Sequence, residues 1–437
     1  MIRTLDARSL GADAVVTALG RSPEQVAPAI HAAVDEILAA VRARGDSALT
    51  EYTARFDRFA ATSAAALAIT PDEFAAAERA LTPETRAALA YAAERIERYH
   101  AAALSKSWRL TDEHGSILGQ EIRPLDRVGV YIPGGRAAYP STVLMTAIPA
   151  RVAGVKDIVL MTPPAPNGSI DPTVLAAARI AGVTEGWRVG GAQAVAALAF
   201  GTATIRRVDK IVGPGNIYVA LAKQRVFGEV GIDMVAGPSE VVVIADTAAD
   251  PAWIAADLLA QAEHDPMARA VLITDDEALA ARVAVVLDQQ LAVLPRRDIA
   301  AQSLRDNGAL ILVETLDAAV DLANRLAPEH LELLVRVPAA LLPRVRHAGA
   351  VFMGGHTPEV VGDYVAGPNH VLPTGGTARF SSPLSTEDFV KRSSVIEYSP
   401  AGLAAALPHL RTLTRLEGLA GHGIAATVRN VEGREAK

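Results

Sequence analysis

The chain has 437 residues, enough for about two or three domains with cores of their own. Half of the residues are hydrophobic, 21% are charged and the formal net charge is −7. This composition is typical of a globular enzyme and argues against a general role in binding nucleic acid or a membrane surface. The absence of cysteine excludes disulfides, cysteine-ligated zinc, iron–sulfur clusters and thiol nucleophiles.

No apolar run reaches the roughly 18 residues of a membrane span, and residues 1–6 lack the apolar core of a signal peptide. We therefore expect a cytoplasmic protein with no membrane partner.

Residues 1–120 have the pattern of a helical arm. The stretch 23–44 is amphipathic and ends at Gly45. Thr70-Pro71 and Thr82-Pro83 each place a capping residue before a proline, which is typical of a helix start. No residue of the arm suggests chemistry, so we expect it to serve in packing or dimerisation.

From residue 121 to 238, short β-branched runs alternate with alanine-rich helical stretches. This alternation predicts βα units on a parallel sheet, with strands at 127–132, 157–161, 186–189 and 209–212. Gly237-Pro238-Ser239 interrupts the series and is the expected hinge to a second domain.

The second series runs from residue 239 to 380, with strands expected at 240–245, 270–274, 309–313, 331–335 and 350–353. The fold class is therefore α/β, with two Rossmann-like parallel-sheet domains, the helical N-terminal arm and a helical C-terminal tail (381–437). In such folds, ligands bind in clefts at the carboxyl ends of strands.

A helix expected at 251–264 ends in two potential metal ligands. Gln261 and His264 are three residues apart, so both side chains leave the same helix face, and Pro266 stops the helix. Imidazole suits zinc and neighbouring metals, whereas an amide oxygen is an uncommon ligand. Two ligands make half a site, and the same residues could form a solvent-facing helix end.

Glu329 and His330 follow Pro328, between a helix and a strand. They offer a carboxylate and an imidazole that titrates near neutral pH. Adjacent residues on a regular strand point to opposite faces, so a shared site requires irregular backbone, to which Pro328 is suited. The alternative is a surface pair at a strand end.

Asp363 and His370 fall in a Gly- and Pro-rich stretch, 354–386, that lacks periodicity. Long irregular loops in compact domains are usually functional or disordered, and the aromatic and apolar residues favour function. Each residue alone could also be ordinary turn chemistry.

Glu417 and His422 lie in the helical tail, about 140° apart on an ideal helix. They can share a face only if the helix breaks near Gly418 or Gly421, and otherwise they belong to a solvated terminal helix. Such a tail could reach a neighbouring subunit.

Two glycine-rich turns, 189–194 and 212–217, run from strand to helix. Bare backbone N–H groups at a helix N-terminus could hold a phosphate there. Neither turn has the G-x-G-x-x-G fingerprint, so the standard dinucleotide motif is absent, and both could be tight packing turns.

Together, these segments resemble the histidinol dehydrogenase family. The matching stretches run in family order from about residue 127 to 427: VGVYIPGGRAAYPSTVLM, RVGGAQAVAALAFGT, DKIVGPGNIYVALAK, GIDMVAGPSEVVVIAD, DLLAQAEHDP, LAPEHLEL, GDYVAGPNHVLPT and EGLAGHGIAA.

The resemblance implies two successive NAD-dependent oxidations, from L-histidinol through the aldehyde to L-histidine. It implies an acid–base pair of Glu329 and His330, and one zinc per subunit held by Gln261, His264, Asp363 and His422. The NAD contacts would be Tyr131, Gln193 and Asn216. The substrate contacts would be Ser239, Gln261, His264, His330, Asp363, His370, Glu417 and His422.

Members of the family are homodimers in which the tail crosses to the partner, which would explain the late position of Glu417 and His422. The chain departs from the family at Gly421 and Gly423, where alanines usually flank the histidine. This departure would loosen the helix around the proposed ligand.

Without cysteine, aldehyde oxidation must proceed through a hydrate rather than a thiohemiacetal. We expect Glu329 to activate the water and His330 to take the hydroxyl proton in both steps. Zinc would orient the substrate through its imidazole and amine, and Glu417 would hold the cationic amine.

Three other functions are compatible with parts of the pattern. A related zinc- and NAD-dependent alcohol dehydrogenase, such as a sulfopropanediol dehydrogenase, would keep the metal and nucleotide residues, but His370 and Glu417 suit a cationic imidazole substrate. A zinc hydrolase would use Glu329 on metal-bound water. A nucleotide-binding regulatory protein would need none of the acid–base residues.

Overall fold

The computed structural model describes residues 2–19, 27–134 and 138–429. The chain divides into two compact units, the first comprising Met1–Ala103 and Leu125–Phe389 and the second Leu104–Pro124 and Val390–Lys437. No helix within the described ranges is long and apolar enough to cross a membrane.

The first of two large sheets in the first unit has the strand order β2-β7-β6-β5-β8-β9 and is parallel except for β2. Its strands are β2 (Ala68–Ile69), β5 (Arg127–Tyr131), β6 (Asp157–Thr162), β7 (Glu185–Arg188), β8 (Lys210–Val212) and β9 (Gly231–Ile232). The helices of this part of the chain are α3 (Pro28–Arg44), α4 (Asp46–Tyr52), α5 (Pro71–Ala80), α6 (Pro83–Ala102), α7 (Pro140–Ala153), α8 (Pro172–Ala181), α9 (Gly191–Phe200) and α10 (Ile217–Val226).

The second sheet has the order β1-β12-β11-β10-β13-β14 and is parallel throughout. Its strands are β1 (Arg3–Asp6), β10 (Glu240–Ala245), β11 (Arg269–Thr274), β12 (Ala309–Leu312), β13 (His330–Leu334) and β14 (Ala350–Met353). The helices here are α1 (Ala7–Leu10), α2 (Ala12–Leu19), α11 (Pro251–Ala262), α12 (Glu277–Val293), α13 (Arg297–Asn307), α14 (Leu316–Leu326), α15 (Pro338–Leu341) and α16 (Glu359–Tyr364).

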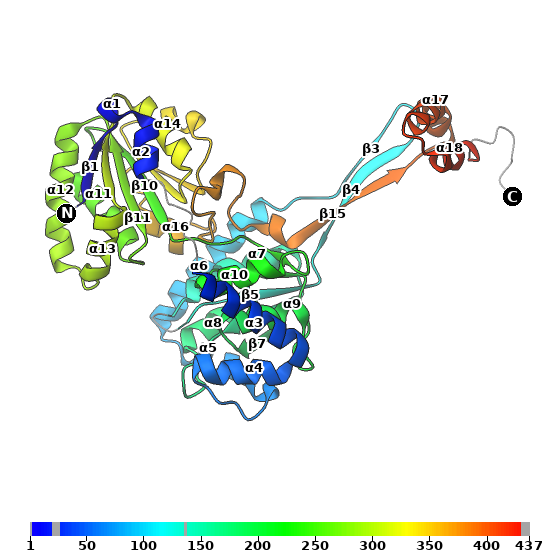
Figure 1. Ribbon diagram of the computed structural model, residues 1–437, viewed down its shortest axis with the longest axis horizontal. Helices are drawn as coiled ribbons and strands as arrows, with labels where there is room; N and C mark the ends of the chain where they lie inside the picture. The colour runs from blue at the N-terminus through cyan, green and yellow to red at the C-terminus, as the bar shows by residue number, and fades with distance from the viewer. Residues whose placement is uncertain (1, 20–26, 135–137, 430–437) are drawn as a thin grey trace. The chain divides into compact units, whose positions relative to one another are not determined.

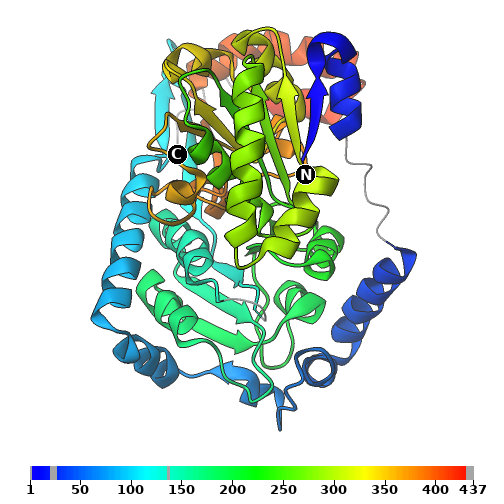
Figure 2. The same ribbon diagram turned by 90° about the vertical axis from the view of Figure 1, so that its left-hand side faces the viewer.

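Helices cover both faces of the second sheet. Helices α11, α12 and α13 lie on one face of the sheet, and α2 and α14 lie on the other (Figures 1 and 2). Apolar side chains of each group pack with those of the strands in a separate core cluster. All six residues of β10 are buried as a result, which explains its unbroken apolar run after Glu240. Each fully buried valine or isoleucine contributes about 1.5–3 kcal/mol to stability.

The two sheets repeat one topology. The five strands β5 to β9 lie side by side in the order β7-β6-β5-β8-β9. The five strands β10 to β14 follow the same pattern, β12-β11-β10-β13-β14. Each sheet has one additional edge strand. In the first sheet β2 pairs with β7, and in the second sheet β1 pairs with β12. The expected α/β class with two Rossmann-like parallel sheets is therefore confirmed.

Several local expectations need correction. The region predicted to be a helical arm, 1–120, also contains β1 and β2, and its residues 108–111 and 117–120 are strand as well. Strand β1 pairs with β12, and its Leu5 packs against the core of the second sheet. Helix α13 was not predicted. Helix α15 ends at Leu341 and continues as a 3₁₀ turn, Leu342–Arg344, because Pro343 cannot donate an N–H to an α-helical bond.

The helix starts predicted at Thr70 and Thr82 are confirmed. The Thr70 hydroxyl accepts a hydrogen bond from the Glu73 N–H, and the Glu73 carboxylate accepts one from the Thr70 N–H, which completes a capping box at the start of α5. Thr82 caps α6 by accepting from the Thr85 N–H. Part of the helix expected at 23–44 lies outside the described residues, and the remainder is α3.

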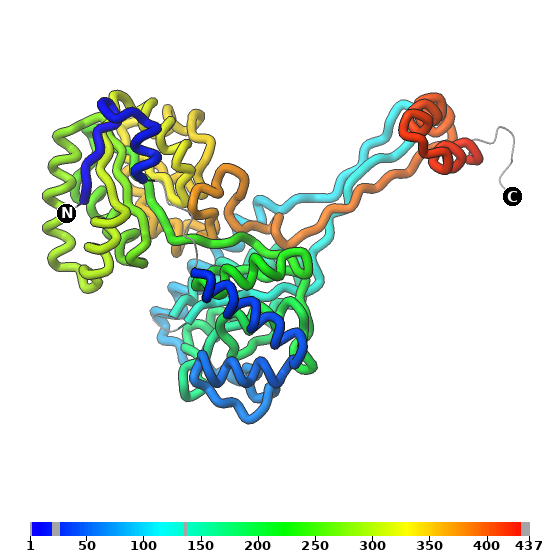
Figure 3. Tube along the Cα trace, viewed as in Figure 1, coloured from blue at the N-terminus to red at the C-terminus, as the bar shows by residue number. Residues whose placement is uncertain are grey.

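The second unit contains an antiparallel sheet of β15 (Val390–Glu397), β4 (Ile117–Pro124) and β3 (Trp108–Thr111), followed by α17 (Pro400–Leu416) and α18 (Ala420–Thr427). The three strands run side by side as a long ribbon with the two helices at its end (Figure 3). The break near Gly418 that a shared face of Glu417 and His422 would require is present, and Gly418 adopts a φ of 70° between the helices.

A buried ion pair fixes the turn between β8 and α10. The Lys223 ammonium and the Asp233 carboxylate are in contact, with side chains 3% and 1% exposed. Lys223 also donates to the Gly213 carbonyl at 2.9 Å, and Asp233 accepts from the Gly213 N–H at 2.7 Å. The ion pair thus provides the hydrogen-bond partners of both the N–H and the carbonyl of Gly213.

We predict that Asp233→Ala lowers the free energy of unfolding by about 3–5 kcal/mol, because Lys223 would remain buried without its counter-charge. Asp298→Ala is the matched control, since the Asp298 side chain is 96% exposed and should contribute under about 0.5 kcal/mol. Urea unfolding of wild type and the two variants measures the difference. Equal midpoints would contradict the assigned role of the pair.

Candidate active site

The acid–base residues predicted from the sequence lie at the amino ends of two paired strands in the second sheet. Glu240 begins β10 and His330 begins β13, and Val241 is in register with His330. The expected place for a ligand is the carboxyl ends of strands, whereas in this sheet these candidate residues lie at the amino ends. The polar residues of the α14–β13 connection come immediately before the strand, so they can only lie at its amino end.

Glu329 and His330 both contact the backbone of Glu240. Glu329 Oε2 accepts from the Glu240 N–H at 2.9 Å, and His330 Nδ1 lies 3.2 Å from the Glu240 carbonyl oxygen. The irregular backbone expected near Pro328 is present, because Ala327 has a φ of 49°. Since a carbonyl only accepts, Nδ1 carries the proton and Nε2 is left as the basic nitrogen.

Carboxylates surround the His330 ring. Glu329 Oε2 and Glu359 Oε1 lie 3.8 Å and 3.7 Å from Nδ1, and Asp363 Oδ1 lies 3.8 Å from Nε2. Potential ligand atoms of His330, Glu359 and Asp363 all lie within 4.8 Å of one another, close enough to share one metal ion. His330 Nε2 has no hydrogen-bond partner among the described residues.

Glu359 was overlooked in the sequence, and Asp363 was wrongly placed in irregular structure. Both lie on α16, four residues apart, so their side chains leave the same face of one turn. That spacing was visible in the sequence, but a helix of 6 residues among glycines and prolines gives too short a pattern to recognise.

Gln261 joins this cluster through Glu359. Its amide nitrogen donates to Glu359 Oε1 at 2.7 Å, and its oxygen accepts from the Glu240 N–H at 2.6 Å. Helix α11 ends at Ala262 rather than at His264 as expected, because the His264 N–H turns back to the Gln261 carbonyl at 3.3 Å. His264 is exposed and interacts electrostatically with Asp363 and His330.

Burial and mutual repulsion shift the protonation of the cluster. Burial raises the pKa of Glu329 to about 7 and that of Glu359 to about 8, although the neighbouring His330 charge opposes both. Burial alone would lower the pKa of His330, but the charges of Glu359, Glu329 and Asp363 prevail and raise it well above its usual value. The site therefore favours positive charge at its centre.

Two further acids lie behind the cluster. Glu332 accepts from the Glu359 N–H at 2.9 Å and is buried. Burial, and then the charge of Asp257, raise the pKa of Glu332 well above its usual value, and burial raises that of Asp257 to about 6. Carboxyl groups thus outnumber basic groups in this part of the core, and a divalent cation would offset the surplus.

A cavity of about 470 Å³ opens beside the cluster and is lined by His330, Asp363 and His370. His370 Nδ1 donates to the Asp363 carbonyl at 2.8 Å, which leaves its Nε2 as the acceptor. Helix α6 contributes His100, which is 1% exposed and has both ring nitrogens without a partner among the described residues.

The three predicted nucleotide contacts belong to the first sheet, at the carboxyl ends of its strands. Tyr131 ends β5, and its hydroxyl accepts from the Gly191 N–H at 3.0 Å. Gln193 is buried in the first turn of α9, and Asn216 caps α10 by accepting from the N–H groups of Tyr218 and Val219.

The glycine-rich turns do not leave their N–H groups bare, contrary to expectation. The Gly190 N–H donates to Asp57 Oδ2 at 3.1 Å, and the Gly213 N–H donates to Asp233 Oδ2 at 2.7 Å. One glycine N–H in each turn is thus bonded to a protein carboxylate. These contacts join residues well apart in the chain, so no local pattern could indicate them.

The remaining predicted residues are Ser239, Glu417 and His422. Ser239 directly precedes β10, where its carbonyl accepts from the Arg269 N–H at 3.0 Å. Glu417 directly follows α17 and His422 lies in α18, so both belong to the second unit, and both are exposed. An alanine at Gly423 would place its Cβ 2.9 Å from Thr414 Oγ1, which indicates that glycine permits close packing of α18 on α17.

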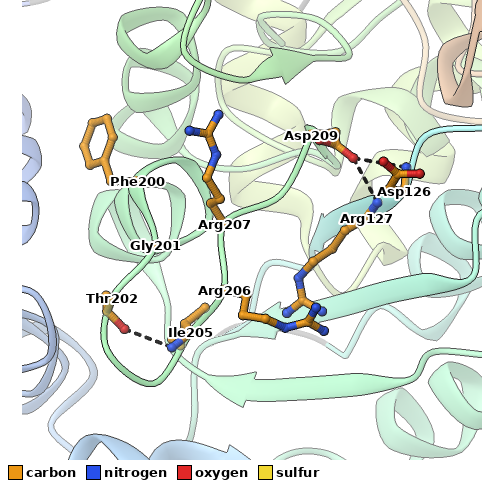
Figure 4. A pocket seen from close by; sticks show the side chains of 9 residues that line it. All are labelled: Asp126, Arg127, Phe200, Gly201, Thr202, Ile205, Arg206, Arg207 and Asp209. Atoms are coloured by element: carbon orange, nitrogen blue, oxygen red, sulfur yellow. Dashed lines mark hydrogen bonds between the residues drawn. The ribbon is translucent and has the colours of Figure 1, made fainter.

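A second cavity, of about 630 Å³, lies at the opposite edge of the first sheet, where β5 and β8 begin (Figure 4). Its basic side chains are already bonded: Arg127 and Arg206 pair with Asp157, and Arg207 donates to the Glu229 carbonyl. None of the predicted site residues lines it, so we do not assign it to the active site.

Comparison with known proteins shows a family resemblance over nearly the whole chain. Residues 20–430 match the family profile described as Histidinol dehydrogenase. A histidinol dehydrogenase from Geobacter sulfurreducens is 53% identical, covering 98% of this chain and 100% of its own, and one from Geobacillus kaustophilus is 56% identical, covering 92% and 94%. The crystal structure of histidinol dehydrogenase from Elizabethkingia anophelis matches with a TM-score of 0.93 at 37% identity and covers 98% of both chains.

His100 provides a test of the burial described for the cavity. Burial lowers its pKa to about 4, whereas an unfolded histidine titrates near 6.5. The unfolded chain binds the proton first as the pH falls, so stability should decrease between about pH 6.5 and pH 4.

The free energy of unfolding of the wild type should decrease as the pH falls from 7 to 4. We predict that this decrease is smaller in His100→Gln, by up to about 3 kcal/mol, when both proteins are unfolded with urea across that pH range. His356→Gln is the control, because His356 is exposed. If His100→Gln left the pH dependence unchanged, the buried neutral state assigned to His100 would be incorrect.

Proposed function

This chain belongs to the histidinol dehydrogenase family, and we propose that it oxidises L-histidinol to L-histidine in two successive steps that each use one NAD. This reaction is the last step of histidine biosynthesis in the family. The observation that carries the proposal is the buried His330 ring with carboxylates at both nitrogens. Oxidation of an alcohol needs a base that takes the hydroxyl proton as hydride leaves the carbon.

His330 is the base in this proposal. Its Nδ1–H is held by the Glu240 carbonyl, so Nε2 is the atom that receives the hydroxyl proton. The carboxylates raise the pKa of His330, so we propose that the positive charge of the bound substrate offsets them and leaves Nε2 unprotonated for this step. Glu359 and Glu329 then stabilise the imidazolium across distances of 3.7 Å and 3.8 Å. His330 acts in both steps, because the alcohol and the aldehyde hydrate each present a hydroxyl group.

Glu329 activates the water of the second step. The chain has no cysteine to form a thiohemiacetal, so the aldehyde must add water before it can lose a second hydride. A carboxylate with a pKa raised to about 7 is a stronger base than an ordinary glutamate and is still ionised in part at neutral pH. Its contact with the Glu240 N–H holds one oxygen and leaves the other for the water.

The cluster also suits the zinc ion that the family implies. Gln261, His264 and Asp363 would hold it, together with His422 from the second unit, and all four offer the oxygen and nitrogen donors that zinc accepts. The surplus of buried carboxyl groups and the unpartnered Oε2 atoms of Glu332 and Glu359 fit a bound cation. When bound, zinc orients the imidazole and amine of the substrate.

The remaining assignments follow from the family resemblance. Tyr131, Gln193 and Asn216 would contact NAD, which accepts the hydride, and Ser239, His370 and Glu417 would contact the substrate together with the zinc ligands. We propose a cytoplasmic homodimer in which Glu417 and His422 of one chain complete the site of the other. Both residues belong to the second unit, whereas the other proposed ligands belong to the first.

We predict that Glu329→Gln slows aldehyde oxidation at least tenfold more than alcohol oxidation, because only the second step needs activated water. Stopped-flow absorbance with histidinol and with histidinal separates the two steps. His330→Asn is the comparator and should slow both steps alike by about 10²-fold or more. Equal losses in both steps for Glu329→Gln would contradict its role in activating water.

A further inference from the structure

We propose that Asp57 is a positioning residue of the dinucleotide site: it fixes the Gln193 amide so that the side-chain oxygen accepts an N–H from the bound dinucleotide. The inference rests on the proposed use of NAD. Asp57 lies 136 residues from Gln193 in the sequence, and neither the sequence pattern nor the family resemblance pointed to it.

Asp57 makes two contacts at the start of α9. Its Oδ2 accepts from the Gly190 N–H at 3.1 Å and from Gln193 Nε2 at 3.4 Å. The adjoining Gly191 N–H donates to the Tyr131 hydroxyl at 3.0 Å. The carboxylate and two of the residues proposed to contact NAD therefore meet at one turn.

The fit at this turn is close. A Cβ at Gly190 would lie 2.7 Å from Asp57 Oδ1, and one at Gly191 would lie 2.7 Å from Gln193 Oε1. Glycine is thus needed at both positions for the two side chains to approach the backbone. Gly191 also has a φ of 63°, which disfavours any other residue.

The carboxylate determines which end of the Gln193 amide is free. An ionised carboxylate can only accept, so the amide must direct its nitrogen toward Asp57 and its oxygen away. That oxygen is buried, with the residue 1% exposed, and it has no partner among the described residues. A buried acceptor without a partner costs about 1–3 kcal/mol, which a donor from the ligand would recover.

Apart from its ribose hydroxyls, the dinucleotide carries two groups that can donate a hydrogen bond to this oxygen. The exocyclic amine of adenine and the carboxamide of nicotinamide each present an N–H₂ donor, and both suit a single buried carbonyl oxygen. The structure assigns an N–H₂ donor as the partner of this oxygen. Analogues of NAD that lack either the adenine amine or the nicotinamide amide determine which of the two groups donates.

The backbone at Asp57 is also unusual. Asp57 ends a π-helical turn, Thr53–Asp57, and is followed by Arg58 with a φ of 58°. Among the described residues, the only other non-glycine residue with positive φ is Ala327, close to Glu329. Strained backbone persists where the surrounding structure holds it in place, frequently at functional sites.

The first experiment measures NAD binding by calorimetry to the full-length protein and its variants. Asp57→Asn should weaken NAD binding about tenfold, because an asparagine can also donate and lets the Gln193 amide turn over. Asp209→Asn is the matched control: Asp209 also accepts from backbone N–H groups, at 3.0 Å and 3.1 Å, but at the amino edge of the sheet. It should change NAD binding less than twofold.

A paired substitution separates positioning from a merely structural role. Gln193→Glu alone should weaken binding more than tenfold, because it brings two carboxylates together. Asp57→Asn combined with Gln193→Glu should restore binding to within about threefold of wild type. In that double variant the introduced amide donates to the introduced carboxylate, and an acceptor oxygen faces the ligand again. A double variant as weak as the weaker single variant would overturn the inference.

The second experiment uses nicotinamide hypoxanthine dinucleotide, which lacks the adenine amine, and 3-acetylpyridine adenine dinucleotide, which lacks the amide N–H₂. Wild type should bind one of them about tenfold more weakly than NAD, and Asp57→Asn should lose that preference. Equal wild-type binding of all three, or a preference kept by Asp57→Asn, would overturn the inference alone. A wild-type protein that binds no NAD would overturn the proposed function itself.

Discussion

The placement of one imidazole among buried carboxyl groups is the constraint on which the rest of the site depends. Each carboxylate removed from water needs a positive charge or a hydrogen-bond donor, and unpaired it would be protonated instead. His330 supplies one positive charge, and the Glu240 N–H, the Glu359 N–H and the Gln261 amide supply donors. These partners do not satisfy every carboxylate oxygen, because Glu332 Oε2 and Glu359 Oε2 have no hydrogen-bond partner among the described residues.

The two sheets share one strand order but place the site residues at opposite edges. The first sheet follows the usual rule, with Tyr131 and the turn before α9 at the carboxyl ends of strands. In the second sheet, Glu240 and His330 begin the strands that correspond to the first and fourth of the repeat. The repeated topology therefore places the residues proposed for NAD at one edge and the residues proposed for acid–base chemistry at the other, and the difference comes from the connections rather than from the sheets.

The sequence was sufficient to predict the elements with strong local signals. Alternating apolar strands and capped helices indicated the parallel sheets, and Thr70 and Thr82 marked helix starts because capping depends on neighbouring residues. The contributions of Glu359 and Asp57 could not be predicted, because each acts through contacts with residues about a hundred or more positions away. The orientation of the Gln261 amide has the same origin, since Glu359 and Glu240 fix it from two distant segments. Local sequence patterns thus indicated which residue types could take part in a site. Tertiary contacts determined how their side-chain atoms are oriented and bonded.

The most direct test of the central claim is the amount of NADH formed per L-histidinol, with limiting substrate, excess NAD, and a reaction run to completion with and without a chelator. The account predicts two NADH per substrate, lost on chelation and restored by zinc, because one buried cluster would serve both oxidations with the metal holding the substrate. One NADH per substrate would mean that the aldehyde leaves before the second step. Full turnover after exhaustive chelation would contradict the role assigned to the metal.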